Sequence, residues 1–182
     1  MNVGIIGSGG REHALCLALK KSNKVKEIFC FPGNAGTKNL AKNIGLNLEN
    51  FEELKDFIYL NKIDLIIVGP EKPLVEGIVD FLEKNNIRVF GPNKIASQLE
   101  GSKIFTKKLC EKHNIPTAKF GIFQDIEKAK NFIKTTKFPL VIKADGLASG
   151  KGVYICADEN DANKAIEEIF GGKFGEAKNL LV

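Results

Sequence analysis

The residues 143–153 combine two lysines, Lys143 and Lys151, with a turn that is rich in glycine. The apolar runs 139–142 and 153–156 predict a strand on either side, so the glycines should lie at the tip of a β-hairpin. A glycine backbone can direct its N–H groups at phosphate oxygens, and the lysines add positive charge. The segment therefore predicts a hairpin that binds phosphate groups.

This hairpin differs from a Walker loop in three respects. Only three residues separate Gly146 from the Gly150–Lys151 pair, Gly152 stands where a Walker loop has Ser or Thr, and a predicted strand follows in place of a helix. The alternative is a surface turn with solvated lysines. A lone Gly-Lys-Gly would fit that alternative equally well, but the whole segment favours phosphate binding.

A second glycine-rich loop, residues 7–10, follows the apolar run 3–6 and opens a predicted helix at 11–21. The free amides and the positive dipole end of such a helix favour an anion. An NAD fingerprint would have its third glycine where this chain has Glu12, and an acidic residue where it has Pro32. We therefore interpret the loop as a phosphate site and disfavour an oxidoreductase.

The first hundred residues alternate predicted strands with predicted helices. This order predicts an α/β fold with a Rossmann-like parallel sheet, helices on both faces and a ligand site at the carboxyl ends of the strands. Loops at that edge would bring Arg11, Glu12, Asn34 and Glu71 together. The predicted strands are 3–6, 28–31, 65–68 and 89–90, and the predicted helices are 11–21, 51–60 and 74–84.

The second part of the chain changes to an α+β order from residue 116 onward. Ser102 is a plausible N-cap for a helix at 103–113, so we place the domain boundary there, with domains 1–101 and 102–182. Strand, helix, strand, hairpin, strand and helix follow, as expected of a lid over a nucleotide. The predicted helices in this order are 126–135 and 159–170, and residues 180–182 begin a last strand.

The composition is that of a globular protein, with 43% hydrophobic and 27% charged residues. No apolar run approaches the ~20 residues that span a bilayer, and the N-terminus enters a strand without a basic leader, so we expect a cytoplasmic protein. The net charge of +5 comes from dispersed lysines mixed with glutamates, which indicates a solvated surface and no nucleic-acid partner. The cysteines Cys16, Cys30, Cys110 and Cys156 form no Cys-x-x-Cys pair for zinc, and we expect buried, reduced thiols.

Five segments in order resemble the glycinamide ribonucleotide synthetase (phosphoribosylamine–glycine ligase) family of ATP-grasp ligases. They are residues 7–14, 32–37, 68–74, 99–103 and 143–153. The resemblance covers the whole chain and implies a pre-ATP-grasp N-terminal domain followed by part of an ATP-grasp domain. It also implies ligation of glycine to 5-phosphoribosylamine in de novo purine biosynthesis. In that reaction ATP phosphorylates the glycine carboxylate, and the amine attacks the glycyl phosphate.

The same resemblance implies two sets of binding residues. Arg11 suits a phosphate, and Glu12 and Glu71 suit ribose hydroxyls, although Glu12 would also fit as an ordinary carboxylate at a helix N-terminus. Contacts with the substrate are expected from Gly9, Gly10, Arg11, Glu12, Asn34, Gly36, Thr37 and Glu71. Contacts with ATP are expected from Lys103, Lys143, Asp145, Gly146, Ser149, Gly150, Lys151 and Gly152.

The cofactors implied are ATP and Mg²⁺, with the acidic metal ligands in a C-terminal portion that follows residue 182 in the family. We therefore expect no metal ligands in this chain, no complete reaction from it alone, and a monomer whose partners are small molecules. No catalytic residue is assigned. His13 lies one turn into a predicted helix with no triad partner in suitable spacing, and His113 suits a helix C-terminus.

Two alternatives stay open. The chain could be a non-catalytic fragment that binds a nucleotide or phosphosugar and needs a partner chain. It could also belong to another ATP-grasp enzyme, such as a biotin-dependent or purine carboxylase. The segments 10–13 and 32–37 favour the ligase over the carboxylases.

Overall fold

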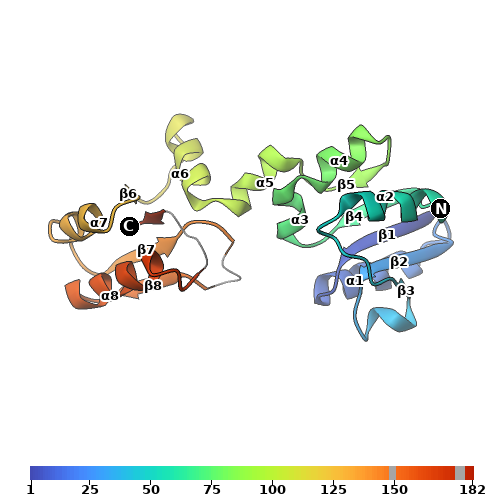
Figure 1. Ribbon diagram of the computed structural model, residues 1–182, viewed down its shortest axis with the longest axis horizontal. Helices are drawn as coiled ribbons and strands as arrows, with labels where there is room; N and C mark the ends of the chain where they lie inside the picture. The colour runs from blue at the N-terminus through green and yellow to red at the C-terminus, as the bar shows by residue number, and fades with distance from the viewer. Residues whose placement is uncertain (148–150, 175–178) are drawn as a thin grey trace. The chain divides into compact units, whose positions relative to one another are not determined.

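The computed structural model describes residues 1–147, 151–174 and 179–182 (Figure 1). These residues form two compact units, Met1–Ser97 (unit 1) and Gln98–Val182 (unit 2). In the described part of the chain, no helix has the length and apolar character needed to cross a membrane. The domain boundary expected between residues 101 and 102 stays a prediction.

Unit 1 is built on a five-stranded sheet in which every pair of neighbours is parallel. The strand order is β3-β2-β1-β4-β5, so the predicted parallel α/β architecture is confirmed. Because the strands are parallel, their carboxyl ends lie at one edge of the sheet. The strands are β1 (Asn2–Gly7), β2 (Glu27–Pro32), β3 (Lys42–Asn43), β4 (Leu65–Val68) and β5 (Val89–Phe90).

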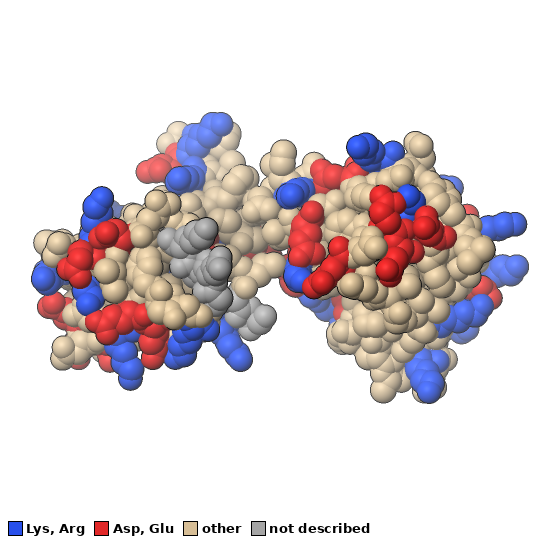
Figure 2. Space-filling view, viewed as in Figure 1, with Lys and Arg blue, Asp and Glu red and all other residues tan. Residues whose placement is uncertain are grey.

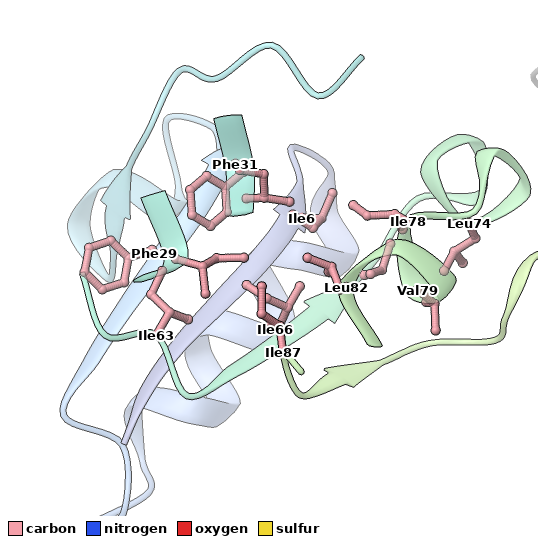
Figure 3. Packing of buried hydrophobic residues seen from close by; sticks show 13 residues of the cluster. Ile6, Phe29, Phe31, Ile63, Ile66, Leu74, Ile78, Val79, Leu82 and Ile87 are labelled. Carbon is pink, nitrogen blue, oxygen red and sulfur yellow. The ribbon is translucent and has the colours of Figure 1, made fainter. Parts of the chain in front are cut away.

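Helices cover both faces of this sheet. Along β1, Ile5 joins a buried cluster with Cys16 of α1 (Gly10–Lys20), whereas its neighbour Ile6 joins a larger cluster on the opposite face. This alternation follows from the two-residue period of a strand. The larger cluster includes side chains of α2 (Phe51–Leu60) and α4 (Ile78–Lys84), and Figure 3 shows its packing.

The prediction of one continuous helix at 74–84 is wrong. The chain forms α3 (Glu71–Glu76) and α4, separated by Gly77 with a φ of 98°. A left-handed residue ends a helix, and glycine adopts that conformation without the steric cost that a Cβ imposes. The Gly77 N–H closes α3 by donating to Pro73 O (3.1 Å) and Leu74 O (3.0 Å).

Three elements of the first hundred residues were not predicted. They are β3, a short 3-10 helix η1 (Thr37–Asn39) and α5 (Lys94–Gly101). Strand β3 has only two residues, both polar and exposed, so it carries no apolar pattern. Its pairing with β2, Phe29 opposite Lys42 and Cys30 opposite Asn43, exists only in the folded unit.

Unit 2 contains a four-stranded antiparallel sheet in the order β6-β9-β7-β8. The predicted hairpin is confirmed, because β7 and β8 pair antiparallel with Lys143 opposite Val153. The predicted helix at 159–170 has these same bounds in α8, whereas the helix predicted at 126–135 ends at Ile133. The elements are α6 (Lys103–Lys112), β6 (Ile122–Phe123), α7 (Ile126–Ile133), β7 (Leu140–Ala144), β8 (Val153–Cys156), α8 (Glu159–Phe170) and β9 (Leu180–Leu181).

The two faces of the unit 2 sheet differ in burial. Ile142 and Ala144 of β7 join α7 and α8 in one buried cluster, whereas Val141, Val153 and Ile155 are exposed. Lys143 belongs with these alternate positions, so it lies on the open face of the sheet. Figure 2 shows basic and acidic residues interspersed on the visible face of unit 2, whereas several acidic residues lie together on the visible face of unit 1.

Candidate functional site

The first candidate site, which we call the crevice, lies in unit 1 at the loops that follow β1, β2 and β4. Gly9 is the N-cap of α1, and Gly10 and Arg11 are its first residues. The first amides of a helix have no partner within the helix, and the dipole adds a partial positive charge there. Ser8, Gly9 and Gly10 are exposed, so this helix end is accessible to an anion.

Glu12 is buried directly beneath this loop, with only 2% of its surface exposed. Its Oε2 accepts a hydrogen bond from the Gly9 N–H at 2.5 Å, while its Oε1 has no hydrogen-bond partner among the described residues. A Cβ added to Gly69 would collide with Oε1, and one added to Gly7 would meet the same side chain. Both glycines therefore make room for Glu12, which supports the alternative of a helix-terminal carboxylate; its predicted contact with ribose stays a prediction.

Asn34 joins the loop after β2 to the loop after β1. Its Nδ2 donates to Ser8 O at 2.8 Å and to Gly9 O at 3.1 Å. Its Oδ1 accepts from the N–H groups of Gly36 at 2.8 Å and Thr37 at 3.0 Å. The amide group thus fixes the position of the glycine loop, a role that the sequence did not reveal.

Thr37 holds the same loop from inside the unit, where it is fully buried. Its Oγ1 accepts from the Asn34 N–H at 2.7 Å and lies 2.8 Å from Asn43 Oδ1. Asn43 in turn donates through Nδ2 to Asn34 O at 2.8 Å. Of the predicted substrate residues, Asn34, Gly36 and Thr37 therefore form one preorganised network behind the exposed glycines.

Arg11 and Glu71 meet across the mouth of the crevice. Arg11 donates from one terminal nitrogen to Glu71 Oε1 at 2.8 Å, and the two side chains are 64% and 39% exposed. The hydrogen bond from Arg11 is the main cause that lowers the pKa of Glu71. A ligand phosphate that approaches Arg11 would compete with this carboxylate.

A cavity of about 500 Å³ opens beside these residues. It is lined by Gly9, Arg11 and also by Glu49, Lys72 and Glu76, which the sequence analysis did not select. Lys72 Nζ lies 3.4 Å from Glu76 Oε1 and 3.8 Å from Glu49 Oε1. Lys72 follows Glu71 directly, so its place in the loop could have indicated it, whereas Glu49 comes from a connection without any motif.

The second candidate site, which we call the hairpin site, lies in unit 2 where the β7–β8 hairpin meets the start of α6. Ser102 Oγ accepts from Phe105 N–H at 3.1 Å, so the predicted N-cap is present. Asp145 accepts from Ser102 Oγ at 3.1 Å and from Ile104 N–H at 3.1 Å. The Asp145 carboxylate therefore anchors the hairpin on the helix N-terminus, and its predicted contact with ATP stays a prediction.

Lys103 makes a second contact between α6 and the hairpin, because its Nζ donates a hydrogen bond to Gly146 O at 2.9 Å. Burial is the main cause that lowers the pKa of Lys103; the charge of Lys143 lowers it further, whereas Asp145 and Glu100 raise it. Lys143 is thus one of the charges that act on Lys103, so an anion bound near both lysines would be attracted by each.

The remaining hairpin residues are placed as follows. Gly146 and Gly152 have left-handed φ angles of 97° and 79°, which glycine adopts readily. Lys151 is exposed. Ser149 and Gly150, two of the predicted ATP contacts, lie outside the described residues.

The two histidines lie at the edge of the crevice and at the end of α6. His13 lies against Gly36, where a Cβ would come within 2.9 Å of its ring, and His113 is the C-cap of α6. Within residues 1–147, 151–174 and 179–182, no group of three or more His, Cys, Asp or Glu side chains is placed to hold a metal ion.

The sequence matches two models of one family along its whole length. "Phosphoribosylglycinamide synthetase, N domain" matches residues 1–100, and "Phosphoribosylglycinamide synthetase, ATP-grasp (A) domain" matches residues 101–182. The fold agrees with a crystal structure of phosphoribosylamine–glycine ligase from Thermotoga maritima, which is 35% identical with a TM-score of 0.78 over 100% of this chain and 42% of that one. An N5-carboxyaminoimidazole ribonucleotide synthetase has the same TM-score at 20% identity, which shows a shared fold alone.

Curated protein sequences that resemble this chain point to the same family. The chain is 45% identical over 183 residues to phosphoribosylamine–glycine ligase of Caldanaerobacter subterraneus subsp. tengcongensis, covering 100% of this chain and 44% of that protein. It is 47% identical over 184 residues to the trifunctional purine biosynthetic protein adenosine-3 of Chironomus tentans, covering 98% of this chain and 13% of that protein. The chain thus spans less than half of the length of these relatives. Because the two family models together match residues 1–182, the chain belongs to the phosphoribosylglycinamide synthetase family.

Proposed function

We propose that this chain serves the ATP-dependent ligation of glycine to 5-phosphoribosylamine in de novo purine biosynthesis, which gives glycinamide ribonucleotide, ADP and phosphate through a glycyl phosphate. Relatives named for this reaction or pathway align along the whole chain. The observation that carries the proposal is the crevice, in which an accessible helix N-terminus, a guanidinium and a ribose-compatible carboxylate lie together.

In the crevice, the proposed roles follow from the contacts. The phosphate of phosphoribosylamine would bind at the amides of Gly9 and Gly10 and at Arg11, whose planar donors suit phosphate oxygens. Glu71, released from Arg11, would accept from the ribose hydroxyls. Asn34 and Thr37 would act by holding the glycine loop in place, since their side chains are already engaged with it. Such preorganisation lowers the cost of ordering the site on binding.

In the hairpin site, Lys103 and Lys143 would neutralise the phosphates of ATP, with Lys151 and the glycine amides as further donors. The supporting observation is geometric: Lys103 contacts the hairpin at Gly146 O, and Lys143 stands on β7 of the same hairpin. Asp145 would position the hairpin through Ser102 and Ile104. In the family reaction Mg²⁺ would neutralise phosphate charge, but the described residues offer no group that fits it, so we derive no step through the metal.

The domain limits 1–101 and 102–182, a cytoplasmic location and a monomeric state belong to the same proposal, as expected of a biosynthetic enzyme with small-molecule substrates. Phosphoryl and acyl transfer of this kind depends mainly on positioning and charge neutralisation. The two sites would supply these functions through residues that contact the phosphate groups.

Calorimetric titration of the 182-residue chain with three ligands tests the proposal. Ribose 5-phosphate should bind more tightly than ribose, because only the former offers a phosphate to the helix N-terminus, and more tightly than NAD. Equal affinity for ribose and ribose 5-phosphate would exclude a phosphate site in the crevice. A preference for NAD over ribose 5-phosphate would favour an oxidoreductase over the ligase.

A further inference from the structure

Cys16 and Cys30 form a pair that the sequence did not indicate. Cys16 lies on α1 and Cys30 on β2, and their Sγ atoms are 3.3 Å apart. Both are fully buried between the helix and the sheet. Neither has a part in the proposed ligation, so the close approach of the two thiols needs a separate account.

The pair lies directly beneath the loop that organises the crevice. Cys30 pairs with Asn43 across β2 and β3, and Asn43 Oδ1 lies 2.8 Å from Thr37 Oγ1. Thr37 in turn binds the Asn34 N–H. One chain of contacts therefore leads from the thiol pair to the residue that holds Ser8 and Gly9.

We propose that Cys16 and Cys30 are a site of reversible oxidation, at which a small peroxide converts the two thiols into a disulfide that alters the Asn34–Thr37 loop. The sulfurs need to approach by only roughly 1.3 Å to reach the ~2.05 Å of a disulfide bond. The proposal of the disulfide is independent of the ligase function proposed above.

The reaction balances with hydrogen peroxide as the oxidant. One sulfur, as its thiolate, attacks a peroxide oxygen; the O–O bond breaks, and the released hydroxide takes up the thiol proton to give water and a sulfenic acid. The second sulfur attacks the sulfenic sulfur; the S–O bond breaks, and water leaves with the second thiol proton. The two sulfurs together lose two electrons, and the peroxide is reduced to two molecules of water.

The surroundings of the two cysteines should make their oxidation slow and should limit which oxidants can reach them. Burial, with the neighbouring Cys16, raises the pKa of Cys30 to about 12, so little thiolate exists at neutral pH. Only a small neutral oxidant that enters during a local opening should reach the pair. Once a sulfenic acid forms, the second sulfur is already in contact and should react before further oxidation.

Disulfide formation would also pull Cys30 toward Cys16 and shift β2 where it pairs with Asn43 of β3. The contact of Asn43 with Thr37, which helps to fix the loop, would then be disturbed. The loop residues should exchange their amide hydrogens faster, because the Asn34 and Thr37 amides depend on this network.

The test uses the 182-residue chain with Cys110→Ser, which removes the partly exposed thiol. After treatment with hydrogen peroxide, trypsin digestion without reductant should yield peptide 12–20 linked to peptide 27–38 as the main oxidation product, and dithiothreitol should separate them. Cys16→Ser and Cys30→Ser are the controls, and both should abolish the linked peptide. If sulfinic or sulfonic acid on single cysteines is the main product, or if the thiols stay reduced while Cys110 in the unsubstituted chain is oxidised, the site is refuted.

Hydrogen exchange measured on the oxidised and reduced chain tests the coupling to the loop. Exchange in peptide 27–38 should be about threefold to tenfold faster after oxidation, the change expected from the loss of about one hydrogen bond in a local opening. Peptide 152–164, which contains the buried Cys156 of unit 2, should not change. An unchanged rate at Asn34 and Thr37 in the linked form would refute the coupling.

Discussion

The crevice of unit 1 and the hairpin site of unit 2 are both suited to phosphate groups, but they are constructed in different ways. In the crevice, side chains such as Asn34 and Thr37 hold the backbone, and the backbone amides at the start of α1 would face the proposed ligand. In the hairpin site, the lysine side chains themselves would face the proposed ligand, and one carboxylate, Asp145, holds the hairpin. A site that depends on fixed amides should respond to changes in its supporting network. A site that depends on lysine charges should respond to pH and salt.

The strongest test of this contrast is to remove the buried hydroxyl of the crevice network. Thr37→Val leaves the Asn34 N–H without its acceptor inside the unit. Loss of a buried partner costs about 1–3 kcal/mol, so the free energy of unfolding of unit 1 should fall by about this amount in urea, measured by amide exchange. Thr135→Val, at an exposed threonine of unit 2, should have little effect. Equal losses in the two variants would mean that the network does not stabilise the crevice.

The corresponding change in unit 2 should be smaller. Asp145→Ala removes the acceptor for Ser102 Oγ and Ile104 N–H. By analogy with the loss of a helix cap, unit 2 should lose about 0.5–2 kcal/mol, because the hairpin loses its anchor on α6. Asp56→Ala, on the exposed surface of α2, is the matched control. A stability unchanged from the parent chain would show that Asp145 does not anchor the hairpin.

The smallest expected effect is a pH dependence of the free energy of unfolding, which should arise at the hairpin site and not at the crevice. Since burial lowers the pKa of Lys103 in the folded chain below its usual 10.5, the unfolded chain binds more protons in the window between these values. Stability should therefore rise as pH increases through that window. Lys103→Met should remove this part of the slope when urea unfolding is compared at about pH 8 and about pH 10, whereas Lys151→Met, at an exposed lysine, should retain it.

Much of the fold could be predicted because local pattern and final structure agree. The apolar run 65–68 became β4 with the same bounds, and Ser102 caps α6 as its residue type suggests. The helix break at Gly77 was not predicted, because the apolar period continues on both sides of it and glycine alone does not require a left-handed turn.

The site residues could be selected from the sequence, but their roles could not be derived from it. Asn34 stands in a loop and Glu12 in the first turn of α1, and neither position reveals a role by itself. Only the folded unit shows that Asn34 joins two loops and that Glu12 fills the space beside Gly7 and Gly69. The approach of Cys16 to Cys30 is likewise set by the packing of α1 on the sheet. Contacts of this kind depend on tertiary structure, which motif spacing does not encode.

Titration of ribose 5-phosphate and ATP into two variants, Arg11→Ala and Lys143→Ala, tests the central claim of two separate phosphate sites most directly. A charge-assisted contact contributes about 1.5–3 kcal/mol, so each loss should weaken one ligand by at least about tenfold. Arg11→Ala should weaken only ribose 5-phosphate and Lys143→Ala only ATP, while Arg88→Ala, at the other arginine of the chain, should change neither. Equal losses of both ligands in either variant would contradict the division between crevice and hairpin site.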